Sequence, residues 1–508
     1  MVWDGWVRGV VAVSQADAER AVSVSDARHS DHRRFWVLSA IVLVGIAIRV
    51  AFLGEPMRYD EAYTFDAYAI HSIRYIVSTY PYPNNQIFST LLTHLAWKLF
   101  GNHLWTVRFS ADVAGPAIVP ASYAVANELY DARAGLWAAA LTAVSAPLID
   151  YSVDGRGYAL GALLILVLLW IAARVLARDR WLLWGCFSVC AALALYTIPT
   201  MAYGVATVAV WLAANAVLRA ELRTWRFFGR LLCSLLIAAG LALILYIPVL
   251  GQPGWTFIKP LSPTWANLSQ LSTSTWDNWN RAWPHPLDWL VALGFLLSLL
   301  VHRRTARHPV PVALAALLAL VGIAVAVPIS PFVRSWLYLV PLYLITAGAG
   351  FAWLFAELGG HIEHRRLRWI LQATGSLLVL GCLGLGVISH GQRGAEQAPS
   401  TDNHMVALIR TRGAAHEQVD LDGGLIFYPA LYYFQRYHYT PPLFARPPRF
   451  ARKPGTRLPN RLLVLMVRPA TSGSVLAFLT AQGVETGRCR ITLIKRMQFI
   501  SAYEVTRD

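Results

Sequence analysis

Apolar stretches long enough to cross a lipid bilayer recur along most of this 508-residue chain. A helix rises about 1.5 Å per residue, so about 20 apolar residues cross a hydrocarbon layer of roughly 30 Å. Hydrophobic residues make up 56% of the chain and charged residues only 14%. We therefore predict an all-α polytopic membrane protein with about eleven transmembrane helices. The stretches lie at about 35–53, 105–128, 135–150, 158–176, 181–199, 201–218, 230–250, 287–301, 309–328, 332–354 and 369–389.

The basic residues indicate how these spans are oriented. A formal net charge of +16 would also suit a nucleic-acid-binding protein, but here the arginines gather in short loops, and every second loop is basic. Such loops stay in the cytoplasm. We predict a cytoplasmic N-terminus and, because an odd number of spans separates the two ends, an exocytoplasmic C-terminal region. The basic clusters are Arg28–Arg34, Arg174–Arg180, Arg219–Arg230, His302–Arg307 and Arg365–Arg368.

Composition divides the chain into three regions. Residues 1–34 look like a disordered cytoplasmic leader, residues 35–390 form the multi-span membrane domain, and residues 391–508 become more polar. Short strand and helix patterns in the last region predict a small exocytoplasmic α/β domain. The strand patterns lie at 418–421, 461–467 and 489–495, and the helical patterns at 428–437 and 473–482.

Two adjacent carboxylates, Asp60 and Glu61, follow the first apolar stretch directly. Carboxylates are costly in hydrocarbon, so this pair must lie at the interface or in a wet cavity. One interpretation is an ordinary solvated loop. The other is a functional site, which the remaining outer loops favour.

Those loops supply cations, aromatic rings and a second polar turn. The turn Tyr80–Gln86 precedes Ile87–Phe100, which is too short to span and is expected to lie along the interface. Arg156 lies in another outer turn, and Arg334 lies at the outer end of a later span. The segment 251–286 carries five tryptophans with Lys259 and Arg281; such rings either anchor in the headgroup layer or stack on sugars.

Together these motifs resemble the polyprenol-phosphate-sugar glycosyltransferases of the C-type fold, which include protein O-mannosyltransferases and aminoarabinose transferases. The resemblance rests on the Asp60-Glu61 pair, the Asn84-Asn85-Gln86 turn, the turn from Tyr151 to Leu160 that holds Arg156, and Pro331-Phe332-Val333-Arg334. It covers about residues 35–355 and is closest to the bacterial branch with lipopolysaccharide-core galacturonosyl transferases. Many relatives carry histidine where this chain has Gln86.

The resemblance implies a function and a site. A hexose or pentose on a polyprenyl phosphate would pass to a lipid, glycan or protein acceptor at the outer face of a bacterial plasma membrane, with inversion. Asp60 is expected to act as general base, with Glu61 orienting the acceptor or sharing the proton. Arg156, Arg334 and, more weakly, Lys259 are expected to bind the donor phosphate. The residues expected to support this site are Arg58, Tyr59, Asn85, Gln86 and Tyr158.

Other interpretations remain open at this point. A lipid-linked glycan flippase or transporter would also need many spans and a few charges, although transporters tend to place them near the bilayer midplane in repeated halves. A noncatalytic protein that binds lipid-linked glycans would tolerate loss of Asp60. No cofactor is predicted; a divalent metal ion could supply part of the positive charge, but only the carboxylates offer ligands.

Overall fold

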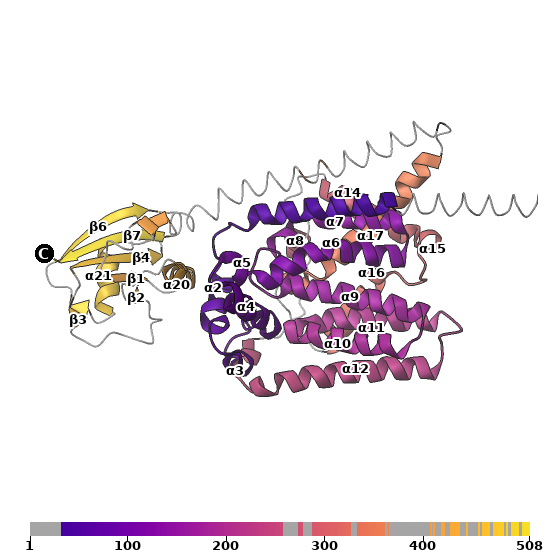
Figure 1. The fold of residues 1–508 in the computed structure, drawn as a ribbon, viewed down its shortest axis with the longest axis horizontal. Helices are drawn as coiled ribbons and strands as arrows, with labels where there is room; N and C mark the ends of the chain where they lie inside the picture. The colour runs from indigo at the N-terminus through magenta and orange to yellow at the C-terminus, as the bar shows by residue number, and fades with distance from the viewer. Residues whose placement is uncertain are drawn as a thin grey trace, which may run out of the picture.

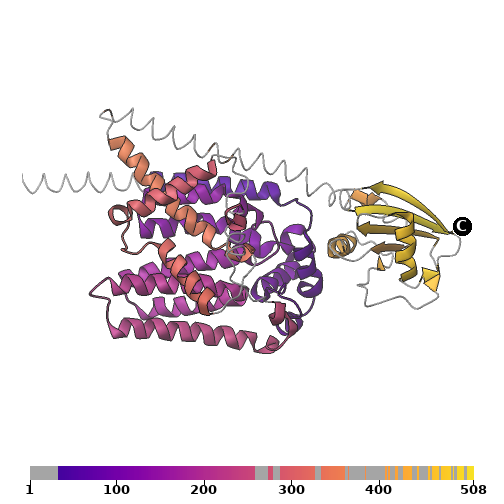
Figure 2. The ribbon, with the colours of Figure 1, turned by 180° about the vertical axis from the view of Figure 1, so that it is seen from behind.

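A computed structural model describes residues 32–257, 273–277, 287–326 and 333–360, and shorter stretches between 364 and 507. In these parts of the chain, long helices run side by side in a bundle (Figure 1). The short helices α2 to α5 gather at one end of the bundle, and a small sheet domain lies beyond that end. Turned to the other side, the later helices α14 to α17 lie across the near face of the bundle (Figure 2).

The bundle consists of ten long helices in the described residues and of shorter elements that connect them. The long helices are His32–Phe52, α6 (Phe109–Leu129), α7 (Ala132–Ala143), α9 (Tyr158–Ala177), α10 (Trp181–Thr197), α11 (Ala202–Val217), α12 (Trp225–Tyr246), α14 (Leu287–Leu300), α16 (Val312–Ala326) and α17 (Leu339–Gly360). The shorter elements are α2 (Tyr59–Thr64), η1 (Phe65–Ala69), α3 (Ile73–Ser78), α4 (Ile87–Phe100), α5 (Leu104–Val107), α8 (Ala146–Asp150), η2 (Pro199–Met201), η3 (Ile247–Val249), η4 (Pro253–Phe257), α15 (His302–Thr305) and η5 (Val333–Trp336).

Five helical segments are long and apolar enough to cross a membrane, so the chain is an integral membrane protein. The predicted count of eleven spans is not confirmed: helices occupy the expected positions up to α17, but several are short, and 369–389 lies almost wholly outside the described residues. The helix expected at the interface is present as α4. The five segments are His32–Phe52, Tyr158–Ala177, Pro199–Val217, Trp225–Val249 and Leu339–Gly360.

The expected span 135–150 is divided into α7 and α8. Ser145 is extended between them, with φ −72° and ψ 115°, and Pro147 lies in the first turn of α8. Proline has no backbone N–H, so it is tolerated in a first turn and stops the helix before it from continuing. The division lets the chain turn at the end of the bundle just before Arg156.

Helix α17 packs tightly enough to fix the position of η5 immediately before it. A Cβ at Gly350 would lie 1.9 Å from the carbonyl oxygen of Gly294 in α14, and one at Gly348 would lie 2.8 Å from the backbone nitrogen of Ala138 in α7. Small residues allow such close approach between helices in a membrane. These contacts hold α17 against α14 and α7. Arg334 lies in η5, immediately before α17.

We predict that Gly350→Ala destabilises the protein. The added methyl group meets backbone, which cannot rotate away, and overpacking of this kind costs about 1–3 kcal/mol. Gly360→Ala is the matched control, because nothing lies within 4 Å of its added Cβ in the same helix. Thermal unfolding of purified protein in detergent should show a lower melting temperature only for Gly350→Ala; equal values would contradict the close packing of α14 and α17.

The C-terminal part forms a five-stranded mixed sheet with the order β2-β1-β4-β7-β6. Strand β1 is parallel to both β2 and β4, whereas β7 is antiparallel to β4 and to β6. Its elements are β1 (Gln418–Leu421), α20 (Phe427–Arg436), β2 (Leu443–Phe444), β4 (Arg461–Val467), α21 (Ser472–Ala481), β6 (Cys489–Arg496) and β7 (Ile500–Arg507), with β3 (Thr456–Arg457) and β5 (Val484–Glu485) as a separate pair.

Both faces of strand β4 are covered. Side chains alternate between the two faces of a strand, and a strand buried on both faces is apolar throughout. Leu462 and Val464 pack in one cluster with Val475 of α21, whereas Leu463 and Leu465 belong to a second cluster that contains Tyr432 and Tyr433 of α20 and residues of the membrane part. The small sheet expected in the C-terminal region is present, with strands β1, β4 and β6 and helices α20 and α21 where the sequence patterns indicated. The sequence interpretation missed β7 and the three two-residue strands.

Candidate active site

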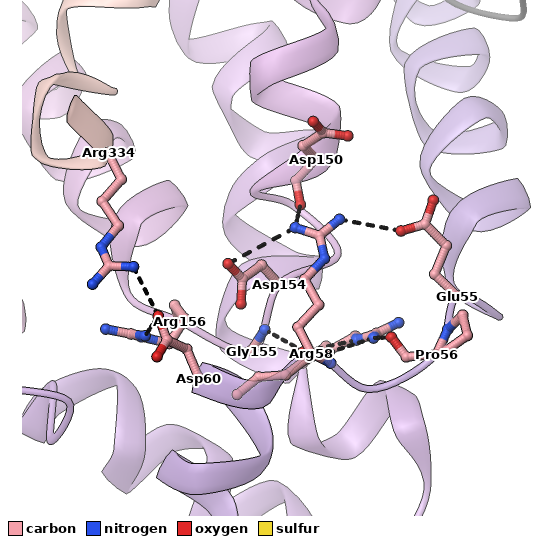
Figure 3. A network of polar contacts seen from close by, with 11 residues as sticks. Glu55, Pro56, Arg58, Asp60, Asp150, Asp154, Gly155, Arg156 and Arg334 are labelled. Carbon is pink, nitrogen blue, oxygen red and sulfur yellow. Dashed lines mark hydrogen bonds and ion pairs between the residues drawn. The ribbon is translucent and has the colours of Figure 1, made fainter. Parts of the chain in front are cut away.

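A partly exposed carboxylate and two arginines form the centre of the site (Figure 3). Oδ2 of Asp60 lies 2.8 Å from Nη1 of Arg156 and 2.8 Å from Nη1 of Arg334. Its other oxygen, Oδ1, accepts a hydrogen bond of 3.2 Å from Nδ2 of Asn84. The three charged residues come from the first turn of α2, the turn before α9, and η5. The structure thus brings together three residues that the sequence assigned to one site.

The arginines keep Asp60 ionised. Burial by itself raises the pKa of the carboxyl group, but the positive charges of Arg156 and Arg334 and the hydrogen bond from Asn84 outweigh it, so this pKa lies below its ordinary value. The side chain of Arg156 is 2% exposed, whereas those of Asp60 and Arg334 are each 32% exposed. The carboxylate can therefore be reached from outside while one of its cations is buried.

Glu61 lies in the protein interior. Its side chain is fully buried, and its two oxygens accept hydrogen bonds of 2.6 and 3.0 Å from the guanidinium group of Arg108. The backbone N–H groups of Arg58 and Gly155 donate to the same carboxylate at 2.7 and 2.8 Å. Burial opposes ionisation, but Arg108 and these donors keep the pKa of Glu61 below its ordinary value. In this structure Glu61 holds protein segments together and has no exposed surface for an acceptor.

The turn that carries Arg156 is held on both sides. Gly155 donates its backbone N–H to Glu61, and Gly157 donates its N–H to Oε1 of Gln86. A Cβ at Gly155 would lie 3.2 Å from Oε2 of Glu61, and one at Gly157 would lie 3.1 Å from Oε1 of Gln86. These close approaches favour glycine at both positions. Gln86 and Glu61 therefore position Arg156 through its neighbours.

Tyr158 lies beside both arginines. The guanidinium carbon of Arg156 is 5.4 Å from the centre of its ring, and that of Arg334 is 5.8 Å away. A cation at this distance from an aromatic face is attracted to it. The ring of Tyr158 attracts both guanidinium groups, and the carboxylate of Asp60 pairs with both of them. Together these contacts offset the repulsion between the two positive charges.

Arg58 points away from Asp60 in Figure 3. It pairs with Glu55 at 3.1 Å and approaches Asp154 at 4.0 Å. Burial, with the nearby charge of Glu61, raises the pKa of Asp154 to about 6 despite Arg58. Arg58 therefore contacts a separate group of carboxylates, Glu55 and Asp154, and its support of the site stays a prediction.

The other predicted residues take different places. Asn85 is 1% exposed and donates to two backbone carbonyl groups at the end of α3, each at 2.8 Å, so it supports the turn from inside. Tyr59 lies among other rings, with ring centres 6.3 Å from Tyr63 and 5.7 Å from Tyr428. Lys259 lies outside the described residues, so its role stays a prediction.

Three residues of the site were missed from the sequence. Arg108 carried a signal, because it is a cation at the outer end of a span, where the positive-inside rule disfavours one. Asn84 lies in the recognised turn but was not chosen, and Asp154 lies two residues before Arg156. The partners of these three residues could not be predicted from the spacing of residues in the sequence.

A divalent metal ion does not fit these carboxylates. Both oxygens of Glu61 are occupied by Arg108 and by backbone N–H groups, and those of Asp60 by two guanidinium groups and an amide. Positive charge already surrounds both groups and would repel a second cation. Within the described stretches, no three His, Cys, Asp or Glu side chains converge as metal ligands.

Known proteins share this architecture. Residues 85–251 match the family model for dolichyl-phosphate-mannose-protein mannosyltransferase. No curated protein matches the sequence. ArnT from Cupriavidus metallidurans in the apo state aligns with a TM-score of 0.58 at 13% identity, over 92% of this chain and 97% of ArnT. The chain has the C-type glycosyltransferase fold. The same ArnT bound to undecaprenyl phosphate aligns with a TM-score of 0.57 at 13% identity, over 92% of this chain and 98% of ArnT.

The predicted resemblance is thus confirmed for the fold. The matched segment 85–251 contains Gln86 and the whole Gly155–Gly157 turn, whereas Asp60 and Arg334 lie outside it. The C-type fold of this chain therefore brings residues from beyond the matched segment onto Arg156.

We predict that Glu61→Gln destabilises the protein strongly. The substitution leaves the buried guanidinium group of Arg108 without its counter-charge, and breaking a buried ion pair in this way costs about 3–5 kcal/mol. Glu504→Gln is the control, because its pair with Arg461 is partly exposed and worth at most about 1 kcal/mol. Thermal unfolding should separate the two, and replacing Arg108 by methionine together with Glu61→Gln should recover part of the loss. A melting temperature for Glu61→Gln like that of the control would refute the structural role.

Proposed function

We propose that this protein is a membrane glycosyltransferase that moves a sugar from a polyprenyl phosphate to an acceptor hydroxyl at the outer face of the membrane. The observation that supports it is the carboxylate of Asp60 held between Arg156 and Arg334. Guanidinium groups suit a phosphate, since they stay charged and offer two parallel donors. A partly exposed, ionised carboxylate suits the removal of a proton. The binding of undecaprenyl phosphate by ArnT supports a lipid-phosphate donor.

The reaction is a single displacement. The acceptor oxygen attacks the anomeric carbon and forms the new glycosidic bond, while its proton passes to Asp60. The bond between the anomeric carbon and the phosphate oxygen breaks, and its electron pair leaves with the polyprenyl phosphate. Arg156 and Arg334 stabilise the charge that develops on this leaving phosphate. Attack from the side opposite the leaving group inverts the anomeric centre.

Donor binding would also strengthen the base. Without donor, the two arginines lower the pKa of Asp60 and make its carboxylate a weak proton acceptor. A donor phosphate bound to the same arginines adds negative charge beside Asp60 and withdraws part of their charge from it. Both effects raise the pKa of Asp60, so its proton affinity rises when the sugar is in place.

The burial of Glu61 leads us to propose a positioning role in place of contact with the acceptor. Through Gly155, Glu61 holds the turn on one side of Arg156, while Gln86 holds it on the other through Gly157. Gln86 has a role here that requires no proton transfer, which suits its replacement of the histidine found in many relatives.

The site and the C-terminal domain belong on the same side of the membrane. Tyr432 and Tyr433 of α20 share a buried cluster with Ala62 and Phe65 of the loop that carries Asp60. With the basic loops in the cytoplasm, this side is the outer one, and the N-terminus is cytoplasmic. We propose a bacterial plasma membrane as the location, with a hexose or pentose as the transferred sugar.

We predict that Asp60→Asn reduces sugar transfer by about 10²–10⁴-fold, because an amide cannot accept the proton from the acceptor. The measurement is transfer from labelled polyprenyl-phosphate sugars by purified protein in membranes that contain host lipid and glycan extract. Asp179→Asn is the matched control, since Asp179 is also paired with an arginine, Arg230, away from the site.

Two results would reject the assignment. Undiminished transfer by a folded Asp60→Asn protein would show that Asp60 is not the base. Movement of intact labelled lipid across the membrane without transfer would favour a flippase.

We predict that substitutions of the two site arginines and of Asp60 change the affinity for the lipid phosphate in opposite directions. Arg156→Lys and Arg334→Lys should weaken the binding of undecaprenyl phosphate by about tenfold, because the paired donors of each guanidinium group are lost. Asp60→Asn should tighten it, because a negative charge next to the phosphate is removed. Equilibrium binding of labelled undecaprenyl phosphate measures both changes in affinity, with Arg461→Lys as the control. Lys259→Ala in the same assay tests the predicted role of Lys259, which lies outside the described residues. Weaker binding in Asp60→Asn would contradict a phosphate site on these arginines.

A further inference from the structure

Four tyrosines form an aromatic wall beside Asp60, three from the segment that carries Asp60 and one from α20. We use the name tyrosine wall for Tyr59, Tyr63, Tyr82 and Tyr428. The ring of Tyr63 lies at its centre: Tyr428 packs edge-on against it with ring centres 4.6 Å apart, Tyr82 packs edge-on at 6.0 Å, and Tyr59 lies nearly parallel at 6.3 Å. The residues Tyr59, Tyr63 and Tyr428 are half-buried, and Tyr82 is 45% exposed. Part of the surface of each of these residues is therefore exposed.

The wall is next to the proposed base. Tyr59 directly precedes Asp60 in α2, and Tyr63 follows one helical turn after Tyr59, on the same face. Burial, and then the charge of Asp60, raises the pKa of Tyr59. Tyr82 lies two residues before Asn84, whose amide donates to Asp60. The carboxylate thus has tyrosines beside it in addition to its two arginines.

A role as a membrane anchor does not explain the wall. Interfacial tyrosines project toward the headgroups from the ends of spans. Here Tyr428 comes from α20 of the C-terminal domain, about 370 residues further along the chain, and meets Tyr63 edge-on. The same helix is fixed in place by Tyr433, whose hydroxyl accepts a hydrogen bond of 2.8 Å from the backbone N–H of Met57. The C-terminal domain therefore contributes a ring to the neighbourhood of the base.

A buried carboxyl group lies in η1, which directly follows α2. Asp66 in η1 is 6% exposed, and neither of its carboxyl oxygens has a hydrogen-bond partner among the residues that the structure describes. Burial raises the pKa of Asp66 well above its ordinary value, which favours the protonated form of its carboxyl group. A buried polar group without a partner is costly. Burial, followed by the nearby phenols of Tyr63 and Tyr59, raises the pKa of Tyr428.

We propose that the tyrosine wall binds the sugar ring that carries the attacking hydroxyl, so that the acceptor is a carbohydrate. This inference rests on the proposed function, because it assigns the acceptor of that reaction. A pyranose ring presents an apolar face of C–H groups that packs on aromatic faces, and an edge of hydroxyls that pair with phenols and carboxyl groups. The wall supplies both kinds of contact, and a peptide hydroxyl has no ring to stack.

Saturation-transfer NMR on the full-length protein in lipid nanodiscs tests this without turnover. The probes are the methyl glycosides of glucose, galactose and mannose, with cyclohexylmethanol as an alcohol of similar size and acetyl-Gly-Ser-Gly-amide as a peptide hydroxyl. We expect the ring protons of at least one glycoside to receive saturation, with an affinity about tenfold lower in Tyr428→Leu, as expected for loss of one aromatic contact. Tyr75→Ala removes another exposed outer tyrosine outside the wall and is expected to bind like the wild type.

The choice of variants separates stacking from packing. Tyr428→Phe keeps the ring and should retain most of the affinity, whereas Tyr428→Leu fills the space against Tyr63 without an aromatic face. Equal affinities for these two variants would overturn the proposal, as would glycosides that bind no better than cyclohexylmethanol, or a peptide that binds in their place. Because binding needs neither donor nor Asp60, these outcomes are distinct from a failure of sugar transfer in the labelled-donor assay.

Discussion

The buried ion pair between Glu61 and Arg108 is the interaction on which the geometry of the site depends. Arg108 also donates to the carbonyl groups of Leu53 and Pro56, at 3.0 and 3.1 Å, so it ties the end of the first helix to the start of α6. Glu61 accepts hydrogen bonds from the backbone at the start of α2 and from the Gly155 turn, so both segments are held at the same ion pair. A buried charge pair is tolerated only when its hydrogen bonds are satisfied, which restricts these segments to one arrangement. The position of Asp60 follows from that arrangement.

Helix geometry explains why the adjacent carboxylates of Asp60 and Glu61 have different partners. Successive residues of a helix point about 100° apart, so Asp60 and Glu61 in the first turn of α2 cannot face the same partner. Glu61 points to the interior, and Asp60 points to Arg156 and Arg334. The sequence suggested a cooperating pair, because adjacency in the chain looks like adjacency in space. That inference fails once the pair lies in a helix, which the sequence interpretation had not predicted at this point.

Apolar length and alternation made most of the elements predictable, since both depend on a few neighbouring residues. Helices α9, α10 and α11 and strand β4 appear close to their expected bounds, whereas α12 begins earlier and α17 begins later than expected. Of the site, Asp60, Arg156 and Arg334 could be assigned together only through the family resemblance, because nothing in local spacing joins residues 274 positions apart. Features that depend on tertiary packing could not be predicted from the sequence. They are the ion pair of Arg108 with Glu61, the break before α8, and the packing of α20 near Ala62.

The distance in sequence between Asp60 and Arg334 also has a consequence for biosynthesis. A chain is synthesised and folds from its N-terminus onward. When α9 has been inserted, Asp60 can already meet Arg156, but η5 and α17 follow only after several further helices. Tyr428 follows later still, in the C-terminal domain. A nascent or prematurely ended chain therefore presents a carboxylate with one arginine and an incomplete site, so the growing polypeptide does not have the complete set of charges until almost all of its membrane part has been made.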